Sequence, residues 1–183
     1  DARAHRALAA IVRKKDPVTK ARKKGEPLCA PGQSELAAAI EVAEGMEGSY
    51  LVIQGPPGTG KTYTAARLIH HLALQGKRVG VTSNSHKVIN HLLEEVADVA
   101  AEARKPVKIA KKISDDVSKC EHADVVNFKN DIPPGALVLG GTSWFFLKFP
   151  RESLDYLVVD EAGQFSLADL IADICVAPPS EWR

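Results

Sequence analysis

The sequence predicts an α/β domain built on a mainly parallel sheet with helices on both faces. Five short apolar runs do not alternate with polar residues, which is typical of parallel strands that are covered on both sides. Segments with helical periodicity separate these runs, and such alternation gives a three-layer domain with right-handed crossovers. The five predicted strands cover residues 51–53, 79–82, 107–110, 137–139 and 157–159.

The first elements in chain order are a basic segment and a helix. Residues 1–30 are expected to form a partly ordered lead-in, because residues 1–24 hold nine Lys or Arg against two Asp. Such an arm is typical either of a solvated segment or of one that contacts nucleic-acid phosphates. The domain proper is predicted to span residues 31–183, and its first helix starts at Leu36 and ends at Gly45 and Gly48.

Two further helices follow the first two predicted strands. Apolar residues recur at i, i+3, i+4 and i+7 from Ala65 and again from Ile89, which is the spacing of an amphipathic helix. Residues 111–135 are polar and mixed in charge, and they give no clear prediction of their structure.

The residues that follow the first predicted strand fit the phosphate-binding pattern G-x-x-x-x-G-K-[ST] at every defined position. Glycines allow successive backbone N–H groups to point at phosphates, and the lysine lies along the β- and γ-phosphates. The hydroxyl of Thr62 is expected to hold Mg²⁺. The predicted nucleotide site consists of Gly55, Pro56, Pro57, Gly58, Thr59, Gly60, Lys61 and Thr62, with the adjacent Tyr63.

An acidic pair ends the last predicted strand. Asp160 is expected to hold Mg²⁺ together with Thr62, and Glu161 is placed to polarise the attacking water as a general base. The sequence therefore predicts an ATP hydrolase whose catalytic residues are Lys61, Asp160 and Glu161 and whose cofactors are ATP and Mg²⁺.

Short polar segments after other strands complete a larger pattern. Residues 83–86 (Ser-Asn-Ser-His) follow the second strand, residues 142–143 (Thr-Ser) follow the fourth, and residues 162–164 (Ala-Gly-Gln) continue the acidic pair. Together with the glycine loop, they resemble superfamily 1 helicases, nearest the branch of the nonsense-mediated-decay RNA helicase and the Dna2-type nuclease-helicases. The resemblance covers residues 33–164 and implies the first RecA-like P-loop domain of an ATP-dependent DNA or RNA helicase or translocase.

The resemblance also implies roles for single residues. Gln33 would read the adenine edge and favour ATP over GTP, and Gln164 would link the hydrolysis site to the nucleic acid. The residues that would contact the backbone of single-stranded DNA or RNA are Ser83, Asn84, His86, Thr142 and Ser143. Residues 83–85 are also expected as caps of the helix that follows, and both roles hold together if one residue caps while the others face the strand. Trp144 and Phe145 are expected either to stack on bases or to pack inside the protein.

The sequence departs from the family pattern at its end. Family members carry a further Gly-Asp-x-x-Gln segment about two dozen residues after the acidic element, and then a second RecA-like domain with arginines that reach the phosphates. We expect a piece of a longer protein, because the chain starts at Asp1, holds its single methionine at Met46 and ends at Arg183. An arginine finger contributes roughly 10³–10⁵ in rate. The piece alone is therefore expected to bind Mg-ATP weakly and to hydrolyse it little.

Two other functions stay open at this point. An AAA+ type ATPase also favours GPPGTGKT, although Ala-Gly-Gln after the acidic pair argues against it. The second alternative is a nucleotide-binding module without strand translocation.

The cysteines bear on the compartment and on metal binding. Three widely separated cysteines favour a reducing compartment, cytoplasmic or, in a eukaryote, nuclear. Cys120 and His122 lack a second pair of ligands that would complete a metal site. No apolar run is long enough to span a bilayer.

Overall fold

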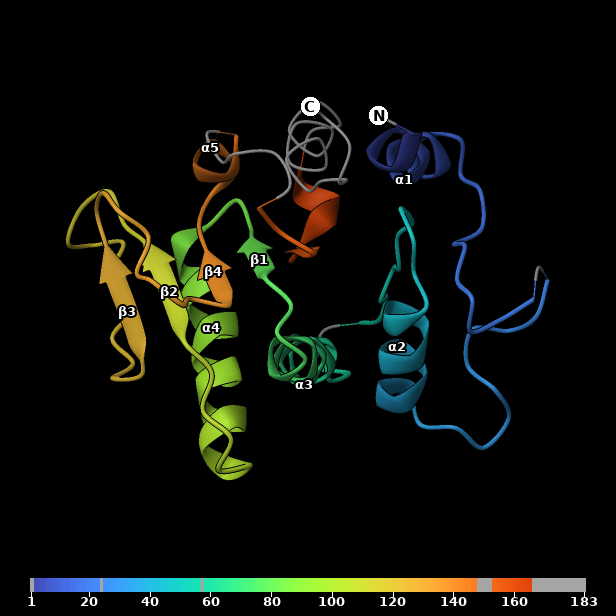
Figure 1. Ribbon diagram of the computed structural model, residues 1–183, viewed down its shortest axis with the longest axis horizontal. Coiled ribbons are helices and arrows are strands. Elements are labelled where there is room, and N and C mark those ends of the chain that lie inside the picture. The colour runs from blue at the N-terminus through green and yellow to red at the C-terminus, as the bar shows by residue number, and fades with distance from the viewer. Residues whose placement is uncertain (1, 24, 57, 148–152, 166–183) are drawn as a thin grey trace.

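The computed structural model describes residues 2–23, 25–56, 58–147 and 153–165 (Figure 1). Its centre is a five-stranded sheet in the order β3-β2-β4-β1-β5, in which every pair of neighbours is parallel. This arrangement confirms the predicted α/β class with a parallel sheet. The strands are β1 (Val79–Thr82), β2 (Ile109–Lys112), β3 (Val125–Phe128), β4 (Val138–Gly140) and β5 (Tyr156–Val159).

The helices start where the sequence offers caps and glycines. The hydroxyl of Ser34 accepts a hydrogen bond from the backbone N–H of Ala37 at the start of α2, and the hydroxyl of Ser85 accepts one from Lys87 at the start of α4. The described helices are α1 (Ala2–Val12), α2 (Glu35–Glu44), α3 (Lys61–Leu74), α4 (His86–Glu102), α5 (Ser143–Phe146) and the 3₁₀ turn η1 (Ala162–Gln164). None of the helices in the described ranges is long and apolar enough to cross a membrane.

The core lies on both faces of the sheet. The larger cluster joins α3 and α4 to one face, with Ile69, Leu72, Ile89 and Leu93 fully or almost fully buried. The smaller cluster on the other face includes Phe146 of α5. The four residues of β1 are all buried, as expected for a central parallel strand.

Glycine is required at the middle of β1 by the packing of the second face. A Cβ atom at Gly80 would lie 2.7 Å from Cδ1 of Leu154 and 2.9 Å from Cδ1 of Leu157. Leucine side chains therefore fill the space that a larger residue would need, and they hold the polypeptide before β5 against the sheet.

One predicted strand is wrong, and one observed strand is not predicted. Residues 51–53 form no strand, and the side chains of Val52 and Ile53 are 65% and 39% exposed. An apolar run becomes a strand only if a neighbour pairs with it, and no described residue supplies that ladder. The sequence also gives no sign of β3, because its tetrapeptide Val-Val-Asn-Phe lies inside the polar stretch 111–135.

Candidate nucleotide and nucleic-acid site

The carboxyl ends of β4, β1 and β5 are tied together by main-chain hydrogen bonds. The N–H of Gly141 donates to the carbonyl of Val81 over 3.0 Å, and the N–H of Asp160 donates to the carbonyl of Thr82 over 2.9 Å. The segments that leave these three strands therefore start side by side, at the upper edge of the sheet in Figure 1. This is the edge at which open α/β sheets bind ligands.

A side chain joins two of the predicted functional segments at this edge. The amide Nδ2 of Asn84 donates to the carbonyl oxygen of Gln164 over 2.7 Å. The turn that makes this possible starts at Glu161, whose backbone adopts the left-handed conformation with φ of 54°, and its N–H donates to Oδ1 of Asp160 over 2.9 Å. The structure thus brings together the residues after β1 and the acidic segment after β5.

Ser83 and His86 lie in different surroundings, although both belong to the same predicted motif. Ser83 is 1% exposed, and its hydroxyl has no hydrogen-bond partner among the described residues. His86 is half-buried at the start of α4, where its Nδ1 lies 2.9 Å from Nζ of Lys111. Contact of these two side chains with a nucleic-acid strand stays a prediction.

Lys111 is fully buried at the end of β2. Its ammonium donates to the carbonyl of Lys112 over 2.8 Å and faces Nδ1 of His86, and none of the described carboxylates is in hydrogen-bonding contact with it. Burial lowers the pKa of Lys111 to about 8, with nearby Lys112 acting in the same direction. Partial burial, followed by the charge of Lys111, also lowers the pKa of His86. The pair therefore favours a neutral imidazole that accepts at Nδ1.

The segment after β4 turns two aromatic rings inward and one outward. Phe145 lies between the rings of Phe128 and Phe146, with centroid distances of 5.7 and 4.9 Å. Trp144 is 75% exposed. Thr142 caps α5 through its carbonyl, which accepts from the N–H of Phe145. The two alternatives for the aromatic residues therefore separate, because Phe145 packs inside the protein and Trp144 does not.

The glycine loop contains two residues in a backbone conformation that favours glycine. Gly58 and Gly60 have φ values of 81° and 84°, which favour glycine, and a Cβ atom at Gly55 would lie 2.4 Å from Oγ1 of Thr59. The ammonium of Lys61 donates to the carbonyls of Gly55 and Pro56 over 2.7 and 2.9 Å. These residues fit a phosphate, since the loop excludes side chains and supplies a cation. The predicted contact at Pro57 lies outside the described residues.

The loop is not seated at the sheet edge. Figure 1 shows α3, which begins at Lys61, end-on below β1, whereas η1 and α5 lie above the strand ends. Tyr63 is 51% exposed, and the guanidinium of Arg67 lies 3.5 Å from the centroid of its ring. Across the described ranges no group of three or more His, Cys, Asp or Glu side chains is arranged to hold a metal ion. A Mg²⁺ site shared by Thr62 and Asp160 stays a prediction.

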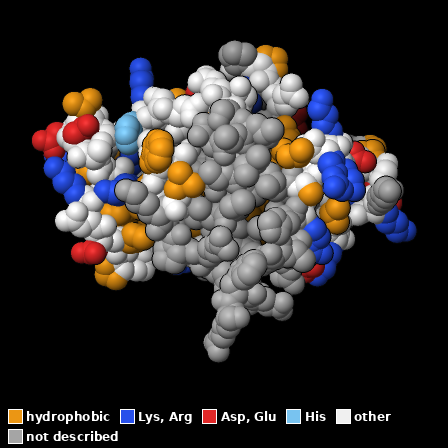
Figure 2. All heavy atoms as spheres, turned by 90° about the horizontal axis from the view of Figure 1, so that it is seen from above, with side chains coloured by type: hydrophobic (Ala, Val, Ile, Leu, Met, Phe, Trp, Pro, Cys, Tyr) orange, Lys and Arg blue, Asp and Glu red, His pale blue; other side chains and the backbone are white. Residues whose placement is uncertain are grey.

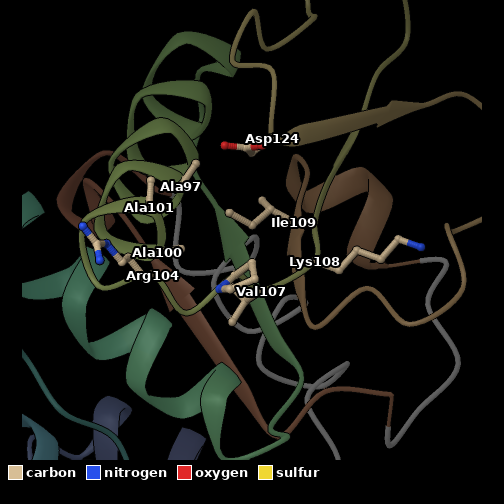
Figure 3. A pocket seen from close by; sticks show the side chains of 9 residues that line it. Ala97, Ala100, Ala101, Arg104, Val107, Lys108, Ile109 and Asp124 are labelled. Carbon is tan, nitrogen blue, oxygen red and sulfur yellow. The ribbon is translucent and has the colours of Figure 1, made fainter.

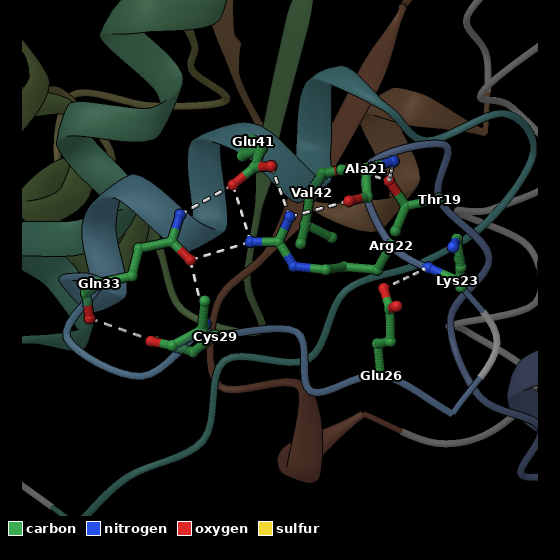
Figure 4. A network of polar contacts seen from close by, with 10 residues as sticks. Thr19, Ala21, Arg22, Lys23, Glu26, Cys29, Gln33, Glu41 and Val42 are labelled. Carbon is green, nitrogen blue, oxygen red and sulfur yellow. Dashed lines mark hydrogen bonds and ion pairs between the residues drawn. The ribbon is translucent and has the colours of Figure 1, made fainter.

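Gln33 is part of a polar network that joins the basic lead-in to α2 (Figure 4). Arg22 donates to both carboxylate oxygens of Glu41 over 2.5 and 2.8 Å and to Oε1 of Gln33 over 2.9 Å. Nε2 of Gln33 donates to Glu41 over 2.8 Å. The hydrogen bonds from Arg22 and then from Gln33 lower the pKa of Glu41 to about 2.

Sequence reasoning missed three residues of these sites: Arg22, Glu41 and Lys111. Glu41 lies on α2, whereas Gln33 precedes the N-cap Ser34, so helical spacing does not relate the two residues. Lys111 directly follows an apolar run that is predicted to end at residue 110, so the sequence does not reveal the burial of its side chain. No local pattern marks Arg22 among the many basic residues of the lead-in.

A separate hollow lies at the amino end of β2 (Figure 3). It has a volume of about 440 Å³ and is open to solvent. The last turns of α4 and the start of β2 form its walls, so it belongs to the edge of the sheet opposite Asn84 and Asp160. The residues that line it are Ala97, Ala100, Ala101, Arg104, Pro106, Val107, Lys108, Ile109 and Asp124.

Comparisons with known proteins identify relatives of this chain. A family model described as AAA domain matches residues 29–178. The chain is 28% identical over 126 residues to the DNA replication ATP-dependent helicase/nuclease DNA2 of Saccharomyces cerevisiae, which is 64% of this chain and 8% of that protein. It is 36% identical over 91 residues to the Regulator of nonsense transcripts 1 homolog of Arabidopsis thaliana, which is 48% of this chain and 7% of that protein.

A third relative is the ATP-dependent helicase NAM7 of Saccharomyces cerevisiae. It is 37% identical over 67 residues, which is 36% of this chain and 7% of that protein. The chain thus spans less than a tenth of the length of these three relatives.

Proposed function

The chain belongs to the AAA domain family, and we propose that it works as the first motor domain of an ATP-dependent helicase or translocase. The resemblance to superfamily 1 helicases is confirmed by relatives that include two named ATP-dependent helicases. Because those relatives are helicases, they do not favour the two alternatives, which are an AAA+ type ATPase that is not a helicase and a nucleotide-binding module without strand translocation. Nucleotide use follows from the same comparison, whereas Mg²⁺ binding by Thr62 and Asp160 is part of the proposal.

The observation that carries the proposal is the hydrogen bond between Asn84 and Gln164. It links the segment after β1, which we propose to contact a strand of DNA or RNA, to the acidic segment that we propose to act on the nucleotide. Small amide and hydroxyl side chains at such an edge suit phosphates and do not read bases. Thr142 and Ser143 are proposed to extend this surface along the edge of the sheet.

We propose that the glycine loop, which lies away from the strand ends in this structure, and the acidic segment after β5 act on one nucleotide, and that each residue has one task. The backbone of the glycine loop and Lys61 bind the phosphates, and Glu161 takes a proton from the attacking water. Bound ATP supplies the energy-rich phosphoanhydride bond, and Mg²⁺ supplies charge neutralisation. A second RecA-like domain is proposed as the partner that completes the site, and closure against it would move the strand.

The proposal is tested by ATPase measurements on the full-length protein with and without single-stranded DNA or RNA. We expect stimulation by one of the two nucleic acids and loss of turnover in Lys61→Ala and Glu161→Gln. Lys105→Ala is a matched control, because Lys105 is exposed just beyond the far end of α4. An ATPase that no single strand stimulates would contradict the motor function.

A further inference from the structure

We propose that Arg22 and Glu41 determine how Gln33 reads the base, and that Gln33 as they hold it does not distinguish ATP from GTP. The proposal rests on the proposed function and on the role that the resemblance to superfamily 1 helicases gives to Gln33, which is to face the base of the nucleotide. It departs from the family expectation that this glutamine favours ATP. Arg22 and Glu41 are positioning residues here, because they act through Gln33.

Three neighbours fix the orientation of the Gln33 amide. Its Oε1 lies 2.9 Å from Nη2 of Arg22 and 3.1 Å from the backbone nitrogen of Ala30, and both of these groups can only donate. Its Nε2 lies 2.8 Å from a carboxylate oxygen of Glu41, which accepts. An amide turned by 180° would place its NH₂ against two donors and its oxygen against the carboxylate. Only one orientation is therefore compatible with the network.

The network also holds Arg22 in place. Its Nη1 donates to Glu41 over 2.5 Å and to the carbonyl of Ala21 over 2.8 Å, while Nη2 donates to Glu41 and to Gln33. Charge-assisted, two-pronged contacts between a guanidinium and a carboxylate are among the stronger hydrogen bonds in proteins. A base would therefore have to displace a charged donor to reach the oxygen of Gln33.

The remaining hydrogen-bonding capacity of Gln33 decides what it can recognise. A carbonyl oxygen has two lone pairs, and both are used, whereas one of the two hydrogens on Nε2 is unused among the described residues. Glutamine selects adenine when its oxygen accepts from N6 while its NH₂ donates to N7. A single unused donor can bind N7 of either purine. Gln33 in this network therefore lacks the acceptor that discriminates adenine from guanine.

The experiment compares the displacement of N-methylanthraniloyl-ATP from this chain by ATP and by GTP. For the unchanged chain we expect Kd values for ATP and GTP within about threefold of each other. In Arg22→Met the oxygen of Gln33 regains a lone pair, and two-pronged recognition of adenine then discriminates by roughly 5- to 150-fold. Arg13→Met is the matched control, since Arg13 is an exposed arginine of the same basic segment.

Each result decides the proposal. An unchanged ATP:GTP ratio in Arg22→Met, or a preference for ATP above tenfold in the unchanged chain, would overturn it. Gln33→Ala in the unchanged chain gives a second reading, and we expect it to weaken ATP and GTP equally. Selective weakening of ATP would overturn the proposal even if Arg22→Met did not fold. A chain that binds neither nucleotide, or binds them independently of Lys61, would overturn the proposed function itself.

Discussion

Replacing Lys111 by methionine tests whether a buried ammonium limits the stability of the sheet edge. Lys111 is fully buried, and burial lowers its pKa from 10.5 to about 8. At 1.36 kcal/mol for each pH unit, this difference corresponds to about 3 kcal/mol between the charged and neutral forms. Methionine keeps the approximate length of the side chain and removes the charge.

The sign follows from the protons bound in each state. Between pH 8 and pH 10.5 the unfolded chain keeps the Lys111 proton while the folded chain has lost it, so the free energy of unfolding rises with pH in this window. The uncharged thioether of Lys111→Met contributes no such rise. We therefore expect the stability of the variant, relative to the unchanged chain, to fall by about 3 kcal/mol between about pH 7.5 and pH 10.5.

Neighbouring titrating groups are removed by taking the difference between the two proteins. Burial raises the pKa of Cys120 from 9.0 to about 11, which makes stability fall with pH from 9 to 11 in both proteins. The other charged or titratable neighbours are His86, Lys112 and Asp115. Urea denaturation followed by circular dichroism across this pH range gives the difference, and the exposed Lys105→Met serves as the control. A relative stability that stays constant within about 0.5 kcal/mol would refute the reasoning.

Three further predictions concern packing and exposure. Trp144→Ala should weaken the binding of a single-stranded oligonucleotide to the full-length protein by roughly 5- to 150-fold if the exposed indole stacks on a base; an equal loss on an abasic strand would contradict stacking. Gly80→Ala should lower the free energy of unfolding by about 1–3 kcal/mol, because its Cβ would meet a leucine methyl at 2.7 Å; in urea denaturation, the uncrowded Gly163→Ala should change it less. The exposed Cys29 should react with a thiol reagent at about pH 8 faster than the buried Cys120, whose pKa is raised, as peptide mass spectrometry would show; equal rates would contradict the burial.

The parallel sheet can be predicted because its central strands are apolar without alternation. The strand predicted over residues 79–82 is β1, with the same bounds. The strand predicted over residues 107–110 lies instead at Ile109–Lys112. The prediction ended too early because two lysines, which are usually exposed, form the end of the strand. The pattern of polar and apolar residues does not show that the aliphatic part of the Lys111 side chain packs beside Gly140. Gly140 leaves room for it because it has no Cβ atom.

The site can be predicted in part for the same physical reason. Residues at the carboxyl ends of parallel strands meet at one edge, so Asn84 and Gln164 can be placed together from their positions in the sequence. The Arg22–Glu41–Gln33 network cannot, because a contact across nineteen residues of largely irregular chain leaves no periodic signal. For residues 51–53 the sequence predicts a strand that the structure does not contain, since an apolar run predicts a strand whether or not a pairing partner is present.

The contacts of Lys61 bear on how the loop takes up a nucleotide. Its ammonium is satisfied by two neutral carbonyls of its own loop, those of Gly55 and Pro56. A phosphate oxygen carries negative charge and a carbonyl oxygen does not, so Coulomb attraction to the ammonium favours phosphate oxygens over these carbonyls. The loop is joined on one side to α2, which the Arg22 network holds, and on the other to α3, which packs on α4. We expect phosphate binding to turn the Lys61 side chain away from both carbonyls and to change the loop more than either helix. Hydrogen exchange of the chain with and without ATP measures this, and protection spread evenly over α2, the loop and α3 would argue against it.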